Sequence, residues 1–479
     1  MPTILDCYTD EPSGLGVPPY LGVYPRYVYG RLVYDKPKYL TIDDLRNTQP
    51  RKQLKHKTDI AVKNLTRSQE ETLKILDETR TLYIIAGVHT PGKYLSAIPG
   101  SLGELNRLLS TLKCEKVLVG PAAKGTQLHG GKRPETGLEL FDRVESVEEN
   151  YTKINNYAVD GARVAKQIPY PVIAEIETGR GCPRREHCSF CMEGMKRLEH
   201  RDSREILNEL GALKEHGIQN IRFGRQSCFY SYKGCRPNET EKLLKGASRL
   251  GFKVIHIDNA NPAIVDTSKG ERITELIVEY CTPGNVAAFG VESFDENVQI
   301  DNCLNTDSNT VFEAVKQINR LGGERGDNGM PKFLPGINIL HGLRGETKKT
   351  HDENMKWLKK MLDEDLMLRR INIRQVVRFP GTPLGDNPPK LKTRRYYYSW
   401  RRQIRTEIDH EMLKRVAPVG TIIRDVRMEV KDGKNTFGRQ FGSYPLIAGV
   451  KQELELGKPY SLEVTGHMLR SLVCQPCNP

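Results

Sequence analysis

The sequence lacks any apolar run of about 18 residues, the shortest stretch that a membrane-spanning helix needs. Its first residues also lack the basic start and the apolar core of a secretory signal. Eleven cysteines in 479 residues do not make the dense pattern of a small disulfide-stabilised secreted domain. We therefore expect a cytoplasmic protein in a reducing compartment, with no membrane as a partner.

Three of the cysteines stand in one short loop. Cys182, Cys188 and Cys191 have the spacing Cys-x5-Cys-x2-Cys and follow a β-prone run. Three thiolates can bind three irons of a 4Fe–4S cluster and leave the fourth iron open, whereas four thiolates close the cluster. One alternative is a zinc site with His187 as the fourth ligand, and another is three buried thiols without a metal.

The loop resembles the cluster loop of the radical S-adenosylmethionine (SAM) superfamily. The commonest spacing there is Cys-x3-Cys-x2-Cys, so the first gap is longer here, but Phe190 before the last cysteine is typical. In that superfamily the open iron binds SAM, and an electron splits its C–S bond to give a 5′-deoxyadenosyl radical. The resemblance implies a 4Fe–4S cluster, SAM and an external low-potential electron donor.

Later segments resemble, in order, the strand ends of the radical SAM barrel, and they supply candidate residues for SAM. The second-strand segment departs from the usual Gly-Gly-Glu, and an ordinary strand-end turn is the alternative there. An arginine replaces the usual proline in the fifth-strand segment. The candidate SAM-binding residues are Gln226, Ser227, Glu292, Ser293 and Arg344.

A run of polar residues between the second and fourth of these segments allows two interpretations. His256, Asp258, Asn259 and Asn261 stand at the end of a buried strand pattern. They could point into the mouth of the barrel, where substrate or ribose binds. Alternatively, they start a capped helix, since Asp and Asn are good caps.

The chain is too long for one core, and we expect an α/β protein of several parts. These are a Rossmann-like domain over 1–150, a partial (β/α)6 barrel over 166–390, a basic helical connector over 391–419 and a small TRAM- or OB-like β-barrel over 420–479. Strands are expected near 3–7, 39–42, 81–85, 116–119, 172–177, 219–223, 253–257, 286–291, 336–341 and 371–377.

The first domain precedes the barrel, as the cobalamin-binding domain does in one class of radical SAM methyltransferases. No Asp-x-His-x-x-Gly motif is present to supply a histidine to cobalt. Only Cys7 and Cys114 lie in this domain, so the second cluster of the radical SAM methylthiotransferases is not expected. A domain that only packs or docks substrate is the alternative. The candidate cobalamin-binding residues are Pro18, Leu21, Gly87, His89 and Gly120.

The net charge of +13 favours an acidic partner such as nucleic acid or an acidic protein. Arginines interleave with aromatics between Arg394 and Arg402, and this stretch could stack on RNA. The alternative is an amphipathic helix whose aromatics are core and whose arginines are solvated.

Two further cysteines form a lone Cys-x2-Cys near the end of the sequence. Cys474 and Cys477 could complete an auxiliary cluster with Cys228 and Cys235. Surface thiols or a terminal reducing pair are the alternatives.

The resemblances together predict a cobalamin-dependent radical SAM enzyme that methylates an unactivated sp3 carbon of a protein side chain. Residues 4–20 resemble an archaeal radical SAM family, which suggests glutamine methylation in the alpha subunit of methyl-coenzyme M reductase. The alternative function is a radical SAM enzyme that modifies RNA, similar to the methylthiotransferases. A protein that merely carries a cluster is a third possibility.

Overall fold

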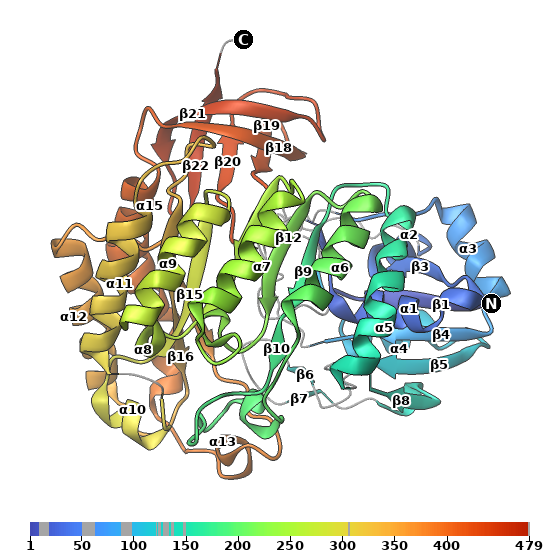
Figure 1. Cartoon of the computed structure of the whole chain (residues 1–479), viewed down its shortest axis with the longest axis horizontal. Helices are drawn as coiled ribbons and strands as arrows, with labels where there is room; N and C mark the ends of the chain where they lie inside the picture. Colours follow the sequence, from blue (N-terminus) through green and yellow to red (C-terminus); the bar gives the residue numbers. More distant parts are fainter. Residues whose placement is uncertain are drawn as a thin grey trace. The chain divides into compact units, whose positions relative to one another are not determined.

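The structure is a computed structural model. It describes residues 1–8, 19–49, 63–87, 98–120, 122, 126–127, 134–135, 138–146, 150–304 and 307–477. The chain forms two compact units, one of residues 1–176 with 201–221 and the other of residues 177–200 with 222–479 (Figure 1). No helix in the described part of the chain is long and apolar enough to cross a membrane.

The first unit contains a five-stranded parallel sheet with the order β3-β1-β4-β5-β8. Most residues of its central strands are buried, as expected when both faces of a parallel sheet are covered. The four strands expected in this part of the sequence are confirmed. The bounds are β1 Pro2–Asp6, β3 Lys38–Thr41, β4 Thr81–Ile85, β5 Glu115–Val119 and β8 Arg143–Glu145.

Numbered within this sheet, the strand order is 2-1-3-4-5, which is the flavodoxin-like order of doubly wound folds and not the 3-2-1-4-5-6 order of the Rossmann fold. The strand order reverses between β1 and β4. In such sheets, ligands bind outside the carboxyl ends of the strands at this point. The fold thus marks one edge of the sheet as the place for a ligand.

Two helices of the first unit cross with their backbones in contact. α1 (Val23–Arg31) packs on α5 (Tyr151–Gly161). A Cβ atom on Gly30 would lie 1.9 Å from the Tyr157 carbonyl oxygen, and one on Gly161 would lie 2.2 Å from the Arg26 carbonyl oxygen. Only glycine therefore fits at these two positions of the crossing.

The second unit carries a parallel sheet with the order β14-β15-β16-β17. Helices α7 (Pro237–Arg249), α9 (Ser268–Tyr280), α11 (Ser308–Gly322) and α12 (Lys348–Asp363) alternate with the strands, and α11 packs on β16. The strands expected between 172 and 377 are all present: β9 Ile173–Glu177, β12 Asn220–Arg225, β13 Val254–Ile257 with β14 Asn259–Ala260, β15 Asn285–Glu292, β16 Phe333–His341 and β17 Arg370–Gln375.

The sheet of the second unit has one polar face. In β17, Ile371 and Ile373 are buried, whereas Arg370, Asn372 and Arg374 between them are only half-buried. The side chains of a strand alternate between its two faces, so these three polar residues share one face. The sheet thereby offers a partly accessible polar surface on the side away from its apolar packing.

The basic segment after the sheet is helical and amphipathic. It contains α14 (Tyr397–Ile404), a π-helical turn (Arg405–Asp409) and α15 (His410–Val416). Tyr397 and Trp400 are buried, and the Trp400 ring stacks on other rings of the second unit. This favours the amphipathic-helix interpretation, in which the aromatics are core, over a continuous RNA-stacking surface.

The end of the described chain forms five strands in the closed order β18-β19-β20-β22-β21. All neighbours are antiparallel except β20 and β22. Cys474 is buried inside β22, and its backbone pairs with β20 and β21. The bounds are β18 Ile422–Asp432, β19 Asn435–Arg439, β20 Ile447–Val450, β21 Pro459–His467 and β22 Ser471–Pro476.

Candidate functional site

The three-cysteine loop is closed at its base by a short antiparallel ribbon. β10 (Gly179–Arg180) pairs with β11 (Glu199–His200). Gly181 has a φ of +81°, and a Cβ atom there would lie 2.6 Å from the Arg197 carbonyl oxygen. The glycine thus allows the chain to turn directly into the loop, as its place before the first thiol requires.

The thiols of Cys182, Cys188 and Cys191 lie near enough to influence one another. Burial raises the pKa of Cys188 to about 12; Arg184 opposes this shift and the other two cysteines add to it. Burial also raises the pKa of Cys191. The Arg184 Nη1 donates a hydrogen bond of 3.2 Å to the Cys188 sulfur, a contact that favours a thiolate.

A cluster and a single ion place different demands on the three thiols. Within the described residues, no group of three His, Cys, Asp or Glu side chains is placed to hold one metal ion. Thiolates on a 4Fe–4S cluster each bind a different iron, so they need not converge on one point. The cluster and the zinc alternative with His187 both stay predictions.

Asn302 braces the loop, a role that its place in the sequence does not indicate. Its side chain is fully buried. The Ser189 hydroxyl donates to Asn302 Oδ1 at 2.8 Å, and the Ser189 N–H donates to the Asn302 carbonyl at 3.0 Å. Asn302 Nδ2 donates to the Arg344 carbonyl at 3.0 Å. One side chain therefore joins the cysteine loop to the loop after β16.

Gln226 and Ser227 connect the end of β12 to the start of the cysteine loop. The Ser227 hydroxyl donates to the Gly181 carbonyl at 2.7 Å. The Gln226 side chain donates to the Phe223 carbonyl at 2.8 Å and accepts from Thr178. Both side chains are engaged within the protein, so they position the loop, and a contact with SAM stays a prediction.

Glu292 has the unusual geometry expected of a functional residue. It ends β15 at a register shift and has a φ of +65°, which is rare for a residue with a side chain. Burial raises its pKa to about 8, and Arg374 partly opposes that shift. Its Oε2 has no hydrogen-bond partner among the described residues. Such an unpaired buried oxygen is available to a ligand.

Ser293 and Arg344 have structural partners. The Ser293 hydroxyl is buried and accepts from the Asp295 N–H at 3.1 Å, so it stabilises a local turn. The Arg344 guanidinium donates to the carbonyls of Pro383 and Asn387, the latter at 3.3 Å. Arg344 braces the two loops that it bridges, and contacts of Ser293 and Arg344 with SAM stay predictions.

The polar residues at the end of β13 and after it serve different purposes: one caps a helix and the others hold neighbouring loops. Asn261 caps a short helix by accepting from the Ala263 N–H at 3.0 Å, as the capping interpretation expects. Asn259 donates to the Gln226 carbonyl at 2.9 Å. His256 accepts from the Ser443 N–H at 2.8 Å, and Asp258 accepts from the Tyr444 hydroxyl. The last two residues thus bind the loop between β19 and β20.

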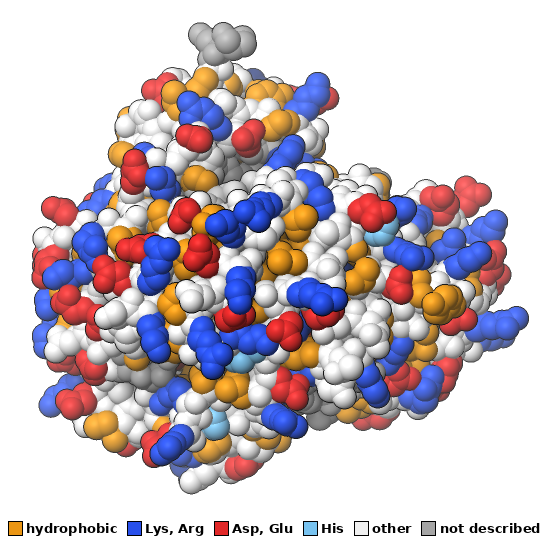
Figure 2. All heavy atoms as spheres, viewed as in Figure 1, with side chains coloured by type: hydrophobic (Ala, Val, Ile, Leu, Met, Phe, Trp, Pro, Cys, Tyr) orange, Lys and Arg blue, Asp and Glu red, His pale blue; other side chains and the backbone are white. Residues whose placement is uncertain are grey.

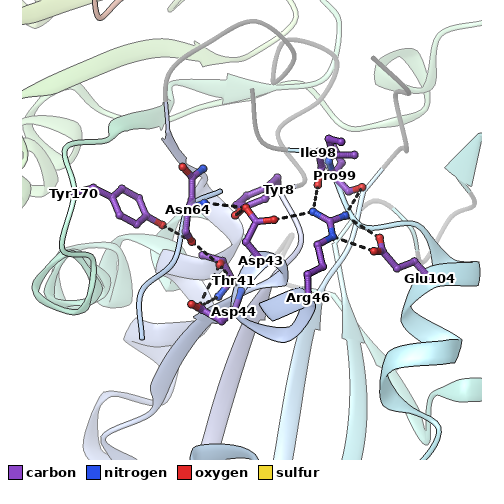
Figure 3. A network of polar contacts seen from close by, with 10 residues as sticks. All are labelled: Tyr8, Thr41, Asp43, Asp44, Arg46, Asn64, Ile98, Pro99, Glu104 and Tyr170. Atoms are coloured by element: carbon purple, nitrogen blue, oxygen red, sulfur yellow. Dashed lines mark hydrogen bonds and ion pairs between the residues drawn. The ribbon is translucent and has the colours of Figure 1, made fainter. Parts of the chain in front are cut away.

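In the first unit, a polar network lies at the carboxyl ends of β1 and β3 (Figure 3). Asp43 accepts from the Tyr8 hydroxyl at 2.7 Å, from the Asn64 N–H at 2.9 Å and from Arg46 at 2.9 Å. Arg46 also pairs with Glu104 at 2.8 Å. One guanidinium thus joins two carboxylates, and the network holds this edge of the sheet in place.

The cobalamin candidates fall into three groups. Gly87 lies two residues after β4 and Gly120 directly follows β5, at the edge where the fold favours a ligand, and Gly120 has a φ of +98°. Leu21 lies elsewhere: it pairs with Ala174 in another sheet and is fully buried, and its contact with a cofactor stays a prediction. Pro18 and His89 lie outside the described residues.

Comparison with known proteins gives the class. The family model of the radical SAM superfamily matches residues 176–358. The chain therefore carries a radical SAM domain and is a radical SAM enzyme, a class that uses a 4Fe–4S cluster and SAM.

It is 42% identical to an uncharacterized protein of Methanocaldococcus jannaschii, over 98% of this chain and 92% of that protein. A protein of Archaeoglobus fulgidus is 39% identical, over 93% of this chain and 84% of that protein. The chain belongs to the family of these archaeal proteins.

Solved structures show more distant similarity. The apo structure of the cobalamin-dependent SAM radical enzyme OxsB matches with a TM-score of 0.48 and 12% identity, over 74% of this chain. The chain spans about half of the OxsB chain, 51%. The coproporphyrinogen III oxidase HemN of Escherichia coli matches with a TM-score of 0.38 and 13% identity, over 59% of this chain and 70% of that one.

Proposed function

We propose that the protein is a cobalamin-dependent radical SAM methyltransferase that acts on an unactivated sp3 carbon of a protein side chain. The observation that carries the proposal is the three-cysteine loop braced by Asn302, in a radical SAM domain that also presents the unpaired carboxyl of Glu292. Cys182, Cys188 and Cys191 are the proposed cluster ligands.

Three residues of the second unit then have a role in binding the cluster or SAM. When bound, the cluster supplies the electron that splits the C–S bond of SAM. Arg184 donates to the Cys188 sulfur and stabilises its thiolate form. Glu292 has one carboxyl oxygen without a partner in the described structure, and this oxygen can bind a ribose hydroxyl or the amino group of SAM. Asn302 keeps the loops that surround these groups in register.

The cobalamin part of the proposal rests on the first unit. Its strand order supports a ligand site at the carboxyl ends of β1 and β4, and Gly87 follows β4 by two residues. Bound cobalamin would supply the methyl group. Cys7 is buried, and Cys114 is the only other cysteine before residue 150, so a second three-thiolate cluster in this part is disfavoured. This favours methylation over methylthiolation.

The cluster assignment is tested by two matched cysteine substitutions. We expect Cys191→Ala to abolish the formation of 5′-deoxyadenosine from SAM after anaerobic reconstitution and reduction, because the cluster loses a ligand. Cys281→Ala removes a thiol at the end of α9 and is the control that should retain activity. Measured by chromatography, equal product from wild type and Cys191→Ala would contradict the assignment.

The target is tested by comparing the host with and without the gene. We propose a protein side chain, with the alpha subunit of methyl-coenzyme M reductase as the first target to examine. Mass spectrometry of the two proteomes should then show one peptide that loses the mass of a methylene group in the deletion strain. An intact peptide together with an altered nucleoside would point to RNA.

RNA modification is the second candidate. The net charge is +13, and Tyr398 is 63% exposed beside the arginines of α14. However, Tyr397 and Trp400 are buried, and Figure 2 shows basic and acidic side chains intermixed on the face that it displays. These observations give the RNA candidate less support than the protein candidate.

A further inference from the structure

Arg370 is an arginine with no acceptor for its N–H groups among the described residues. It opens β17 and lies on the polar face of the sheet, where it is half-buried. Burial lowers the pKa of Arg370, since a partly desolvated guanidinium is costly. Its N–H groups are therefore open to an acceptor from outside the fold, either water or an anion.

The surrounding chain is shaped to hold this side chain. Gly336 lies opposite Arg370 on β16, and a Cβ atom there would be 2.8 Å from the Arg370 Cγ. A glycine inside a strand is unfavourable, and it commonly marks a close approach by another group. Here the absence of a side chain lets the stem of Arg370 lie across the neighbouring strand.

Tyr444 fixes the guanidinium from another direction. The Arg370 guanidinium carbon lies 3.7 Å from the centre of the Tyr444 ring, so the cation stacks on the ring face. Tyr444 itself has a φ of +52°; its carbonyl accepts from Arg369, and its hydroxyl donates to Asp258. Stacking occupies the face of the guanidinium and leaves the N–H groups on its edge available.

Other charged side chains lie around Arg370. Arg222 lies 3.9 Å from Asp258 and 6.0 Å from the Tyr444 ring. Arg374 lies four residues after Arg370 on the same polar face of β17. Asp258 is an acid that acts on Arg370, and one of its oxygens accepts from the Tyr444 hydroxyl. An anion at the edge of the Arg370 guanidinium would therefore also feel the charges of neighbouring arginines.

We propose that Arg370 is a binding site for an oxyanion of the substrate, a carboxylate or a phosphate group, which the guanidinium holds through its N–H edge. Both groups match the fork of donors that an arginine presents. Arg370 pairs with Gly336, whereas Glu292 pairs with Ile339, three positions further along the strand. The oxyanion would therefore lie about 10 Å along the strand direction from Glu292. Its assignment to the substrate rests on the proposed function, but the binding itself does not.

The test measures binding to the full chain, purified without a cluster, by isothermal titration calorimetry. Inorganic phosphate and acetate are titrated into the protein in separate experiments. Wild type should bind at least one probe, and this identifies the oxyanion class. Arg370→Gln should weaken binding by about tenfold or more, since a charge-assisted pair is lost. Gly336→Ala keeps the charge but displaces the stem, and it should also weaken binding. The control Arg320→Gln removes an exposed cation and should bind as wild type does.

Three results would overturn the inference. These are no binding of either probe by wild type, equal binding by Arg370→Gln, or an equal loss in Arg320→Gln. Circular dichroism checks that each variant is folded. Arg370→Lys provides a second variant, which keeps the positive charge but lacks the paired N–H donors of a guanidinium. Cys191→Ala should bind the probes normally, so a failure of the cluster assignment remains distinguishable from a failure of this site.

Discussion

Among single residues, Glu292 carries the most information about function. A left-handed backbone, a buried carboxyl and an unpaired oxygen meet in one side chain. Each feature destabilises the folded state, the backbone strain alone by about 1–3 kcal/mol. The resemblance to the strand ends of the radical SAM barrel identified this residue from sequence. The strain and the missing partner become visible only in the folded chain, because they depend on the register between β15 and β16.

Replacing Glu292 should separate stability from activity. Glu292→Gly fits the left-handed backbone and removes the buried carboxyl, so we expect the free energy of unfolding to rise by about 1 kcal/mol. Glu292→Gln should keep the shape but lower SAM cleavage by about 10- to 100-fold, because a hydrogen bond to a charged or polar ligand atom is altered. Urea denaturation and deoxyadenosine assays measure the two effects. A destabilised glycine variant that retains full activity would assign Glu292 a purely structural role.

His256 predicts how stability depends on pH. Its Nδ1 accepts a hydrogen bond, so the ring is neutral, and burial lowers its pKa from 6.5 to about 4. The unfolded chain takes up a proton on His256 at higher pH than the folded chain. Its contribution to stability is therefore complete above pH 6.5 and is lost as the pH falls toward 4, by about 3 kcal/mol in total.

The variant His256→Gln isolates this contribution. Its amide oxygen can still accept from the Ser443 N–H, but it does not titrate. The difference in unfolding free energy between wild type and variant should change by about 3 kcal/mol between pH 7 and pH 4. Urea titrations of both proteins at several pH values provide the measurement. A difference that is constant with pH would show that His256 is not buried in the neutral form.

Among the elements, the crossing of α1 and α5 depends on glycine. Gly161→Ala would press a methyl group against the Arg26 carbonyl, so we expect a loss of about 2–3 kcal/mol in unfolding free energy. Gly211→Ala in α6 (Ser203–Glu215) is the matched control, since nothing lies within 4 Å of its Cβ position. That variant should be stabilised slightly by the higher helix propensity of alanine. Equal stabilities of the two variants, measured by thermal unfolding, would contradict the close crossing.

The elements of the sheets were predictable, because their central strands are continuous apolar runs between turn residues. The two-residue strand β2, in which Leu21 pairs with Ala174, was not predicted. Strand order cannot be read from local periodicity, and for this reason a Rossmann-like sheet was expected where the order is flavodoxin-like. Asn302 was missed for the same physical reason, since its bonds join segments that are distant in sequence.

At the scale of the whole molecule, the last five strands do more than form the small β-barrel that was expected over 420–479. The loop between two of them contacts the radical SAM domain. The loop between β19 and β20 bonds to His256 and Asp258 of the radical SAM domain. It also stacks Tyr444 on Arg370. This loop therefore completes the polar face of the sheet in the second unit.

The central claim is that three thiolates hold a cluster whose open iron binds SAM. It is tested most directly by the electron paramagnetic resonance spectrum of the reconstituted, reduced full chain, recorded before and after the addition of SAM. The account predicts a 4Fe–4S signal that changes shape when SAM is added, and that is absent from Cys191→Ala. A preparation that contains only zinc, or an iron signal that SAM leaves unchanged, would contradict it.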